Sequence, residues 1–114
     1  MPAAETVLII DDELDSCLLW KSFLTQLNFN VYTALTLKEG MELVDTVKPA
    51  IIFLDNNLPD GLGWEHVDII KAKLPECRIN LVSAHQFDRV MWLNKDVTVI
   101  EKPVTLSSIK TLLL

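Results

Sequence analysis

Two short runs of the chain are apolar without polar alternation, Thr6–Ile10 (TVLII) and Ala50–Leu54 (AIIFL). A strand with one face in water alternates polar and apolar residues, so an unbroken apolar run predicts a strand that is buried on both faces. Strands of this kind are typical of parallel sheets whose two faces are covered by helices. The two runs therefore predict a parallel sheet enclosed between helical layers.

Further strands and helices extend this pattern along the chain. Between the strands, apolar residues recur three or four positions apart, which is the spacing of an amphipathic helix. Five strands that alternate with five helices predict an α/β fold: a doubly wound, five-stranded parallel sheet of the flavodoxin-like type, with strand order 2-1-3-4-5 and helices on both faces. We expect a single domain over residues 1–114, and the abrupt end of the last helix at Leu114 leaves room for a continuation. The other predicted strands are Asn30–Ala34, Arg78–Val82 and Val97–Ile100.

Local signals place the helices between these strands. Thr36 and Glu39 have the spacing of a capping box, and the helix that they begin should stop before Pro49. Residues 56–63 contain proline, aspartate and glycine, which predicts a loop. The apolar faces are Trp20, Phe23, Leu24 and Leu27 in the first helix; Leu37, Met41 and Val44 in the second; Trp64, Val67 and Ile70 in the third, which ends near Pro75; Phe87, Val90, Met91 and Trp92 in a short fourth; and Leu106, Ile109 and Leu113 in the fifth, which Thr105 caps.

The aromatic residues of these helices have two interpretations. Trp20 and Trp64 share helical spacing with other apolar residues, so we expect both to pack in the core. Phe87, Met91 and Trp92 fall in the short fourth helix. They either complete the core or form a partly exposed surface suited to a partner or a second copy of the chain.

Composition bears on where the chain works and what it binds. The 16 acidic residues against 10 basic ones give a net charge of −6, so we expect no direct binding of nucleic acid. No apolar run approaches the roughly 18 residues of a membrane span, and the first residues lack the pattern of a secretory signal. Cys17 and Cys77 match no metal-ligand spacing and are predicted to be reduced thiols. Together these features predict a soluble, cytoplasmic protein that does not engage membranes.

Polar residues follow the predicted strands at the points where they end. Asp11 and Asp12 follow the first strand, Asp55 the third, Ser83 the fourth and Lys102 the fifth. The carboxyl ends of parallel strands meet at one edge of a sheet, so these side chains should converge there.

Taken singly, these residues have ordinary explanations, because Asp12 could cap the next helix and Asp55 could form a turn. Taken together, converging carboxylates repel one another unless a cation is present, and magnesium is a hard ion that carboxylates bind. Lys102 adds a point charge suited to a phosphate oxygen.

These residues and their spacing resemble the receiver domains of bacterial response regulators. The resemblance rests on the Asp11-Asp12 pair, on Asp55, on Ser83-Ala84 and on Lys102-Pro103. The stretch Asp55-Asn56-Asn57-Leu58-Pro59-Asp60-Gly61 is similar to the phosphorylation loop of that family, with Pro59 and Gly63 in the expected places. The resemblance covers essentially the whole chain.

The resemblance implies a role for each site residue. Asp55 would accept a phosphoryl group from a phosphohistidine on a histidine kinase or a histidine phosphotransfer protein. The chain would then be a signalling domain rather than an enzyme, limited to its own phosphorylation and dephosphorylation. The implied magnesium ligands are Asp12, Asp55 and the backbone carbonyl of Asn57, with Asp11 acting through a water; Ser83 and Lys102 would bind the phosphoryl group; Asn57 and His85 would modulate dephosphorylation, although His85 could equally be a solvated loop residue.

Three departures from the family pattern affect how a signal would leave the site. The fifth strand has Val99 where the family places an aromatic residue, the stretch from Ser83 to Lys102 is short, and a Gly-Ala turn before the fifth strand is missing. Valine has one favoured rotamer and cannot make the swing of an aromatic ring. We therefore expect Ser83 to move on phosphorylation and the fifth strand to respond little, with the change appearing at residues 84–86 and in the fourth helix. The family's output and homodimer surface is the fourth helix, fifth strand and fifth helix.

Other functional classes fit the residues less well. A degenerate receiver that serves only as an interaction module would not need the complete acidic site. A phosphohydrolase of the haloacid-dehalogenase type would need a second acid two residues after the nucleophile, where this chain has Asn57. A flavodoxin would need a phosphate loop rich in serine, threonine and glycine.

Overall fold

The computed structural model describes residues 4–83, 97–102 and 104–113. The predicted short fourth helix, with Phe87, Met91 and Trp92, lies outside the described residues. His85 and Pro103 lie outside them as well. The partner or homodimer surface expected on the fourth helix is therefore described only through its neighbours in the fifth strand and the last helix.

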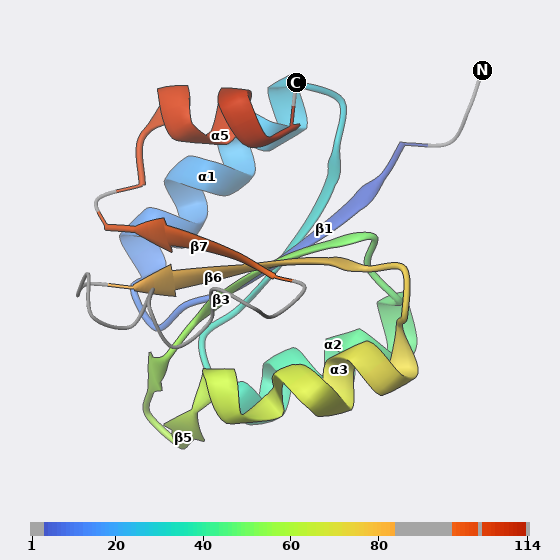
Figure 1. Cartoon of the computed structure of the whole chain (residues 1–114). Coiled ribbons are helices and arrows are strands. Elements are labelled where there is room, and N and C mark those ends of the chain that lie inside the picture. Colours follow the sequence, from blue (N-terminus) through green and yellow to red (C-terminus); the bar gives the residue numbers. More distant parts are fainter. Residues whose placement is uncertain (1–3, 84–96, 103, 114) are drawn as a thin grey trace.

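The described residues form a parallel five-stranded sheet with the order β2-β1-β3-β6-β7 (Figure 1). The strands β6 and β7 are the fourth and fifth of this sheet, so the predicted order 2-1-3-4-5 is confirmed. The strand order changes direction once, at β1, which pairs with both β2 and β3 and occupies an inner position. The strands are β1 (Thr6–Ile10), β2 (Asn30–Ala34), β3 (Ile51–Asp55), β6 (Arg78–Ser83) and β7 (Thr98–Glu101).

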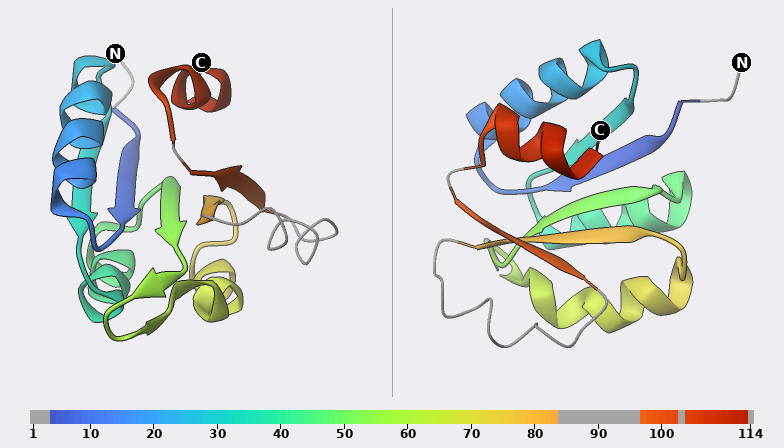
Figure 2. Two further views of the ribbon diagram at one scale, coloured as in Figure 1. Left: turned by 90° about the vertical axis from the view of Figure 1, so that its left-hand side faces the viewer. Right: turned by 45° about the horizontal axis from the view of Figure 1, so that its top comes forward.

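Helices cover both faces of the sheet, as predicted (Figure 2). One layer contains α1 (Leu14–Gln26) and α5 (Leu106–Leu113). The other contains α2 (Leu37–Val47), the 3-10 turn η1 (Gly63–His66) and α3 (Val67–Lys73). Within the described residues, no helix has the length and the apolar character needed to cross a membrane.

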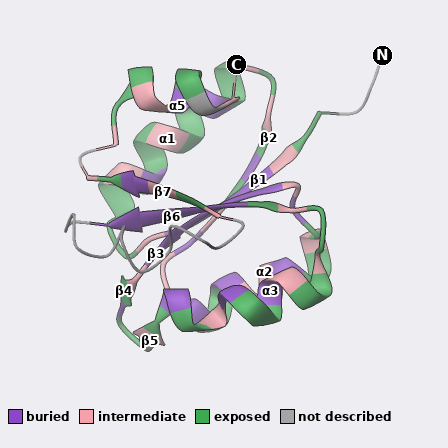
Figure 3. Ribbon diagram, in the orientation of Figure 1, coloured by how far each residue is buried: buried purple, intermediate pink, exposed green. Residues whose placement is uncertain are grey.

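The inner strands are buried on both faces, which explains their unbroken apolar sequence (Figure 3). In β1, Leu8 and Ile10 pack with the layer of α2 and α3, whereas Val7 and Ile9 pack with the layer of α1 and α5. All four side chains are at most 5% exposed. Their burial removes apolar surface from water on both sides of one strand. Each Å² of apolar surface buried in this way stabilises the folded state by about 25 cal/mol.

Strand ends differ from the prediction by one residue, and the difference matters for the site. The third strand is Ile51–Asp55 rather than Ala50–Leu54, because Asp55 continues the ladder opposite Val82. The fourth strand likewise includes Ser83, which pairs with Glu101. Both polar residues are therefore held by strand pairing.

The segment predicted as a loop, residues 56–63, contains a small hairpin instead. Its strands are β4 (Asn57–Leu58) and β5 (Gly61–Leu62), which pair antiparallel. The third helix then begins as the 3-10 turn η1 before continuing as α3. Turn-forming residues predicted a loop here but not the two short strands that pair within it.

The helix caps and faces agree only in part with the prediction. Thr36 caps α2 by accepting a hydrogen bond from the N–H of Glu39 at 3.1 Å, and Thr105 accepts one from the N–H of Ser108 at 3.1 Å. Asp12 does not cap α1, whose N-cap residue is Glu13 and has no side-chain capping bond. Leu106 was expected on the inner face of the last helix but is 45% exposed, whereas Ile109 is buried there.

The two tryptophans expected in the core differ in their burial. Trp64 is 5% exposed and belongs to the cluster under α2 and α3. Trp20 is partly buried and packs against the cluster under α1 and α5. Cys17 and Cys77 form no disulfide, and burial raises the pKa of each thiol to about 11. Both thiols are therefore protonated at neutral pH and are poor nucleophiles.

Candidate functional site

The polar residues that end the strands meet at one edge of the sheet. There they border a hollow of about 200 Å³. The ends of β1, β3, β6 and β7 and the hairpin after β3 build its walls, so side chains far apart in the sequence face one space. The residues that line the hollow are Asp12, Glu13, Asp55, Asn56, Asn57, Val82, Ser83 and Lys102.

Three carboxylates form the acidic part of this site. One oxygen from each of Asp11, Asp12 and Asp55 lies within 4.8 Å of the others. Asp55 is buried, Asp11 is half-buried and Asp12 is exposed. Carboxylate oxygens at this spacing are the donors that a hard divalent cation such as Mg²⁺ prefers, so the residues present fit that ion.

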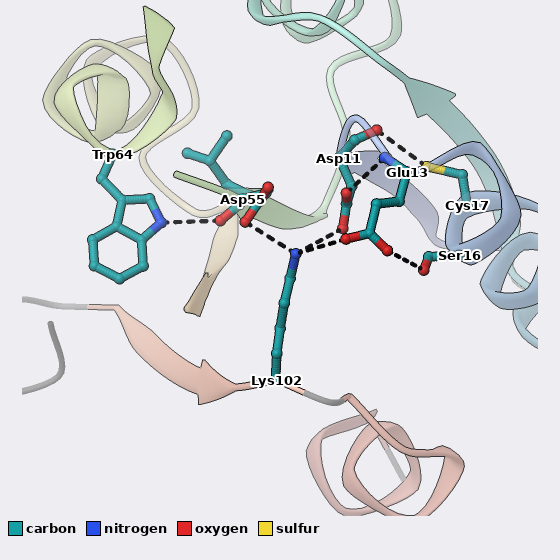
Figure 4. A network of polar contacts seen from close by, with 8 residues as sticks. Asp11, Glu13, Ser16, Cys17, Asp55, Trp64 and Lys102 are labelled. Atoms are coloured by element: carbon teal, nitrogen blue, oxygen red, sulfur yellow. Dashed lines mark hydrogen bonds and ion pairs between the residues drawn. The ribbon is translucent and has the colours of Figure 1, made fainter. Parts of the chain in front are cut away.

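Lys102 supplies a positive charge between these acids (Figure 4). Its Nζ lies 3.4 Å from Asp55 Oδ1, and 3.7 Å from both Asp11 Oδ2 and Glu13 Oε1. Its backbone N–H donates to the carbonyl of Ser83 at 2.6 Å, which fixes the end of β7 beside the end of β6. Burial would lower the pKa of Lys102, but the surrounding carboxylates outweigh it and raise that pKa above its ordinary value.

Burial and charge also set the protonation of the acids. Burial raises the pKa of Asp55 to about 6, although the nearby ammonium of Lys102 acts against the rise. Burial likewise raises the pKa of Asp11, against the hydrogen bond from the N–H of Glu13 and the charge of Lys102. The two carboxylates are therefore incompletely compensated by Lys102 alone, and further positive charge at the site would favour their ionised forms.

Glu13 is a fourth acid of the site that sequence reasoning missed. Its Oε2 accepts a hydrogen bond from Ser16 Oγ at 3.3 Å, and its Oε1 faces Lys102 (Figure 4). Its N–H donates to Asp11 Oδ1 at 3.0 Å, so Asp11 is held by the turn that starts α1. The sequence contains a signal for this residue, since Glu13 is the third consecutive acid after the strand.

Asn56 and Trp64 hold the backbone that follows Asp55, and sequence reasoning missed both roles. The N–H of Gly63 donates to the carbonyl of Asn56 at 2.8 Å, and the N–H of Trp64 donates to Asn56 Oδ1 at 3.1 Å. The indole Nε1–H of Trp64 donates to the carbonyl of Leu54 at 3.1 Å (Figure 4). These bonds close the base of the hairpin against the end of β3, which fixes the approach of Asn57 to the hollow.

The predicted site residues thus divide by where the structure places them. Asp12, Asp55, Asn57, Ser83 and Lys102 share the hollow, and Asp11 joins its carboxylate cluster. His85 lies outside the described residues. Val99, expected in place of an aromatic residue, is half-buried in β7 and packs with the α2 and α3 cluster.

The chain is similar to known proteins over most of its length. The family model of the response regulator receiver domain matches residues 7–114. Regulatory protein LuxO of Vibrio cholerae serotype O1 is 29% identical over 77 residues, which are 68% of this chain and 17% of LuxO. Photosynthetic apparatus regulatory protein RegA of Cereibacter sphaeroides is 25% identical over 83 residues, which are 73% of this chain and 45% of RegA. The chain therefore spans less than half the length of these two relatives.

Solved structures show a similar fold. A two-component response regulator from Clostridium difficile superposes with a TM-score of 0.84 at 25% identity, over 94% of this chain and 90% of that one.

Proposed function

This chain belongs to the response regulator receiver domain family of two-component signalling, and we propose that it accepts a phosphoryl group on Asp55 in a magnesium-dependent reaction. The donor would be a phosphohistidine on a histidine kinase or a histidine phosphotransfer protein. The observation that carries the proposal is the position of Asp55, a buried carboxylate with Lys102 Nζ at 3.4 Å and two further acids beside it.

The proposed chemistry is a displacement at phosphorus. An oxygen of Asp55 forms a bond to phosphorus while the bond to the donor's imidazole nitrogen breaks, and the electron pair of that bond stays on the nitrogen. Asp12, Asp55 and the carbonyl of Asn57 would hold Mg²⁺, with Asp11 acting through water, and the ion would neutralise charge on the transferring phosphoryl oxygens. Lys102 would pair with the same oxygens, and the Ser83 hydroxyl would donate a hydrogen bond to them.

Positive charge around Asp55 has a second effect, because only the ionised carboxylate is a nucleophile. Burial raises the pKa of Asp55 to about 6 in the absence of a bound cation. Lys102 lowers this pKa, and an added divalent cation would lower it further. The positive charges that stabilise the transferring phosphoryl group would therefore also keep the Asp55 carboxylate ionised, and so nucleophilic, at neutral pH.

The setting of the domain is part of the proposal. We propose that the domain does not bind nucleic acid directly, which its net charge of −6 supports, and that it acts in the cytoplasm beside its phosphodonor. Asn57 lines the hollow and is proposed, with His85, to modulate loss of the phosphoryl group. The output or homodimer surface would include β7 and α5, where Val99 replaces the family's aromatic residue and the exposed Leu106 adds apolar area.

Labelling with a small phosphodonor tests the proposal. Incubation with acetyl phosphate and magnesium is expected to add one phosphoryl group that hydroxylamine removes, and mass spectrometry of peptides should locate it at Asp55. Chelation of magnesium should prevent the labelling. Labelling that is independent of magnesium, or that falls on another residue, would contradict the proposal. Magnesium binding without any labelling would instead favour a degenerate receiver that acts as a phosphorylation-independent interaction module.

The Asp12→Ala variant tests the proposed metal ligands. Asp12 is exposed, so the change should alter the free energy of unfolding by no more than about 0.5 kcal/mol, or raise it slightly by relieving repulsion. Magnesium affinity should fall by at least about tenfold. Even the loss of a residue that only hydrogen-bonds to a metal ligand typically lowers metal affinity by that factor. Calorimetric titration measures the magnesium affinity of Asp12→Ala and of a matched control, Asp15→Ala. Asp15 is an exposed acid in the first turn of α1. Equal magnesium affinity in Asp12→Ala and the control would refute the ligand set.

A further inference from the structure

Asp60 connects the hairpin after Asp55 to a helix that lies earlier in the chain. Its Oδ1 accepts a hydrogen bond from the N–H of Leu37 at 2.7 Å, and its Oδ2 accepts one from the N–H of Lys38 at 2.9 Å. Both donors lie in the first turn of α2, where backbone N–H groups have no partner within the helix. One carboxylate therefore joins the β4–β5 turn to α2 through two short bonds.

We propose that Asp60 is a positioning residue for the magnesium site, which it supports by fixing the hairpin that carries Asn57. This inference rests on the proposed function, because it concerns the proposed ligand at Asn57. Asp60 lies in the turn between β4 and β5, three residues beyond Asn57. It does not line the hollow, so it acts through the hairpin backbone rather than on the cation.

The hairpin needs such an anchor because it is too short to hold its own shape. Each of its strands has two residues, and an isolated two-stranded hairpin is marginal in water. Its base is tied to β3 by the bonds between Asn56, Gly63 and Trp64. Asp60 ties its tip to α2, so the backbone at Asn57 is held between two fixed points.

The contact between hairpin and helix extends beyond the carboxylate. Gly61 has a φ of 153°, which a residue with a side chain adopts at a cost. A Cβ at this position would lie 3.3 Å from Leu37 Cδ2, which is tighter than ordinary packing. Gly61 thus lets the turn approach Leu37 closely enough for its neighbour Asp60 to reach the helix.

Asp60 completes the cap of α2, because Thr36 leaves the N–H groups of Leu37 and Lys38 to it, but its bonds do more than cap the helix. Thr36 already caps the helix through the N–H of Glu39, and Glu39 Oε1 accepts a hydrogen bond from the N–H of Leu35 at 3.2 Å. These local bonds stabilise the start of α2 without reference to the hairpin. The Asp60 bonds add a link across 22 and 23 residues of sequence, and that link is what positions the site.

The chain offers a matched control for testing this role. Asp60→Ala and Thr36→Ala each remove side-chain bonds from the same helix start, but Asp60→Ala alone frees the hairpin. Asp60→Ala is expected to weaken magnesium binding by about tenfold, as loss of a supporting partner does at other metal sites. Thr36→Ala should bind magnesium within a factor of about two of the wild type, despite the usual loss of about 1 kcal/mol in stability from a lost cap. Calorimetric titration and urea unfolding give the two quantities for each variant.

Two further measurements separate positioning from general damage. Asp60→Asn keeps one oxygen acceptor, so its magnesium affinity should fall between those of Asp60→Ala and the wild type. Saturating magnesium should restore the rate of labelling by acetyl phosphate in Asp60→Ala, because the carboxylates and Lys102 remain in place. Failure of saturating magnesium to restore the rate would overturn the positioning role.

The outcomes distinguish this inference from the proposed function. If the wild type binds magnesium and Asp60→Ala binds it equally well, or if Thr36→Ala weakens binding as much as Asp60→Ala does, the inference is wrong and the proposed function stands. If the wild type itself fails to bind magnesium, the proposed function fails and the inference fails with it.

Discussion

Replacement of Asp55 by asparagine is expected to abolish phosphorylation and, in the metal-free protein, to raise the free energy of unfolding at neutral pH. The variant has no carboxylate to attack phosphorus, so labelling by acetyl phosphate should disappear completely. The gain in stability follows from burial, which raises the pKa of Asp55 from 3.8 to about 6 in the folded protein. Asparagine has a similar shape and carries no charge to bury.

The sign of the pH dependence follows from that pKa. Between about pH 4 and pH 6 the folded state binds the Asp55 proton more tightly than the unfolded state does, so the wild type loses stability as the pH rises through this window. Above it, the folded protein contains an ionised buried carboxylate at a cost of up to about 3 kcal/mol. The stability difference between Asp55→Asn and the wild type should therefore be near zero at pH 4 and should reach a plateau above pH 6.

Urea unfolding from pH 4 to pH 8 in the presence of a chelator measures this difference. Asp12→Asn serves as the control, because Asp12 is an exposed member of the same cluster and should show a much smaller difference at every pH. Added magnesium should stabilise the wild type more than Asp55→Asn, because a ligand stabilises the state that binds it. A stability difference that does not change with pH would show that burial does not perturb Asp55 in the way described.

Substitution of Gly63 by alanine is expected to destabilise the protein and to disable the site. A Cβ at this position would lie 2.3 Å from the carbonyl oxygen of Asp55 and 2.9 Å from Leu54 Cδ1. The first of these atoms belongs to the backbone of a buried strand, so it cannot rotate away. Overpacking in a filled interior typically costs about 1–3 kcal/mol, and here relief would require the hairpin to move away from β3.

Gly40→Ala provides the comparison for this prediction. Its Cβ would lie 2.6 Å from Ile10 Cδ1, 2.9 Å from Ile10 Cγ1 and 3.0 Å from Ile10 Cγ2, so the buried Ile10 side chain would have to shift, but these three nearest atoms include no backbone atom. Alanine also favours a helix over glycine by up to about 1 kcal/mol, which partly offsets the clash within α2. Thermal or urea unfolding should show a larger loss for Gly63→Ala, together with weakened magnesium binding. An equal loss in the two variants, with magnesium binding intact in both, would contradict this account of Gly63.

The fold was predictable because its main signals are local. Thr6–Ile10 reads as a strand buried on both faces from five consecutive residues, and the structure has the strand at those bounds. The convergence of Asp11, Asp55 and Lys102 follows from the same reasoning, because parallel strands bring their carboxyl ends together. Once the sheet order is known, the residue types at the strand ends therefore indicate which side chains meet in a site.

The hydrogen bonds that hold the backbone around the site were not predictable in this way. The bonds from Asp60 to Leu37 and Lys38 join residues more than twenty positions apart, and their donors are backbone N–H groups, on which the pattern of apolar side chains gives no information. Asn56 looked like a turn residue, and only the structure shows its side chain turned to the N–H of Trp64. Helical periodicity predicted that Leu106 is buried, but it is exposed. Periodicity predicts which face of a helix a residue lies on. It does not predict how far along the helix the neighbouring elements extend.

The position of Lys102 at the end of an edge strand links fraying of the sheet to the charge of the site. β7 pairs only with β6 in the described sheet, whereas β1, which Asp11 follows, and β3, which carries Asp55, are interior. Transient detachment of β7 would withdraw the ammonium from both acids and leave two uncompensated carboxylates at the sheet edge. Local opening of this strand and proton uptake by Asp55 are therefore thermodynamically coupled, so that each makes the other easier.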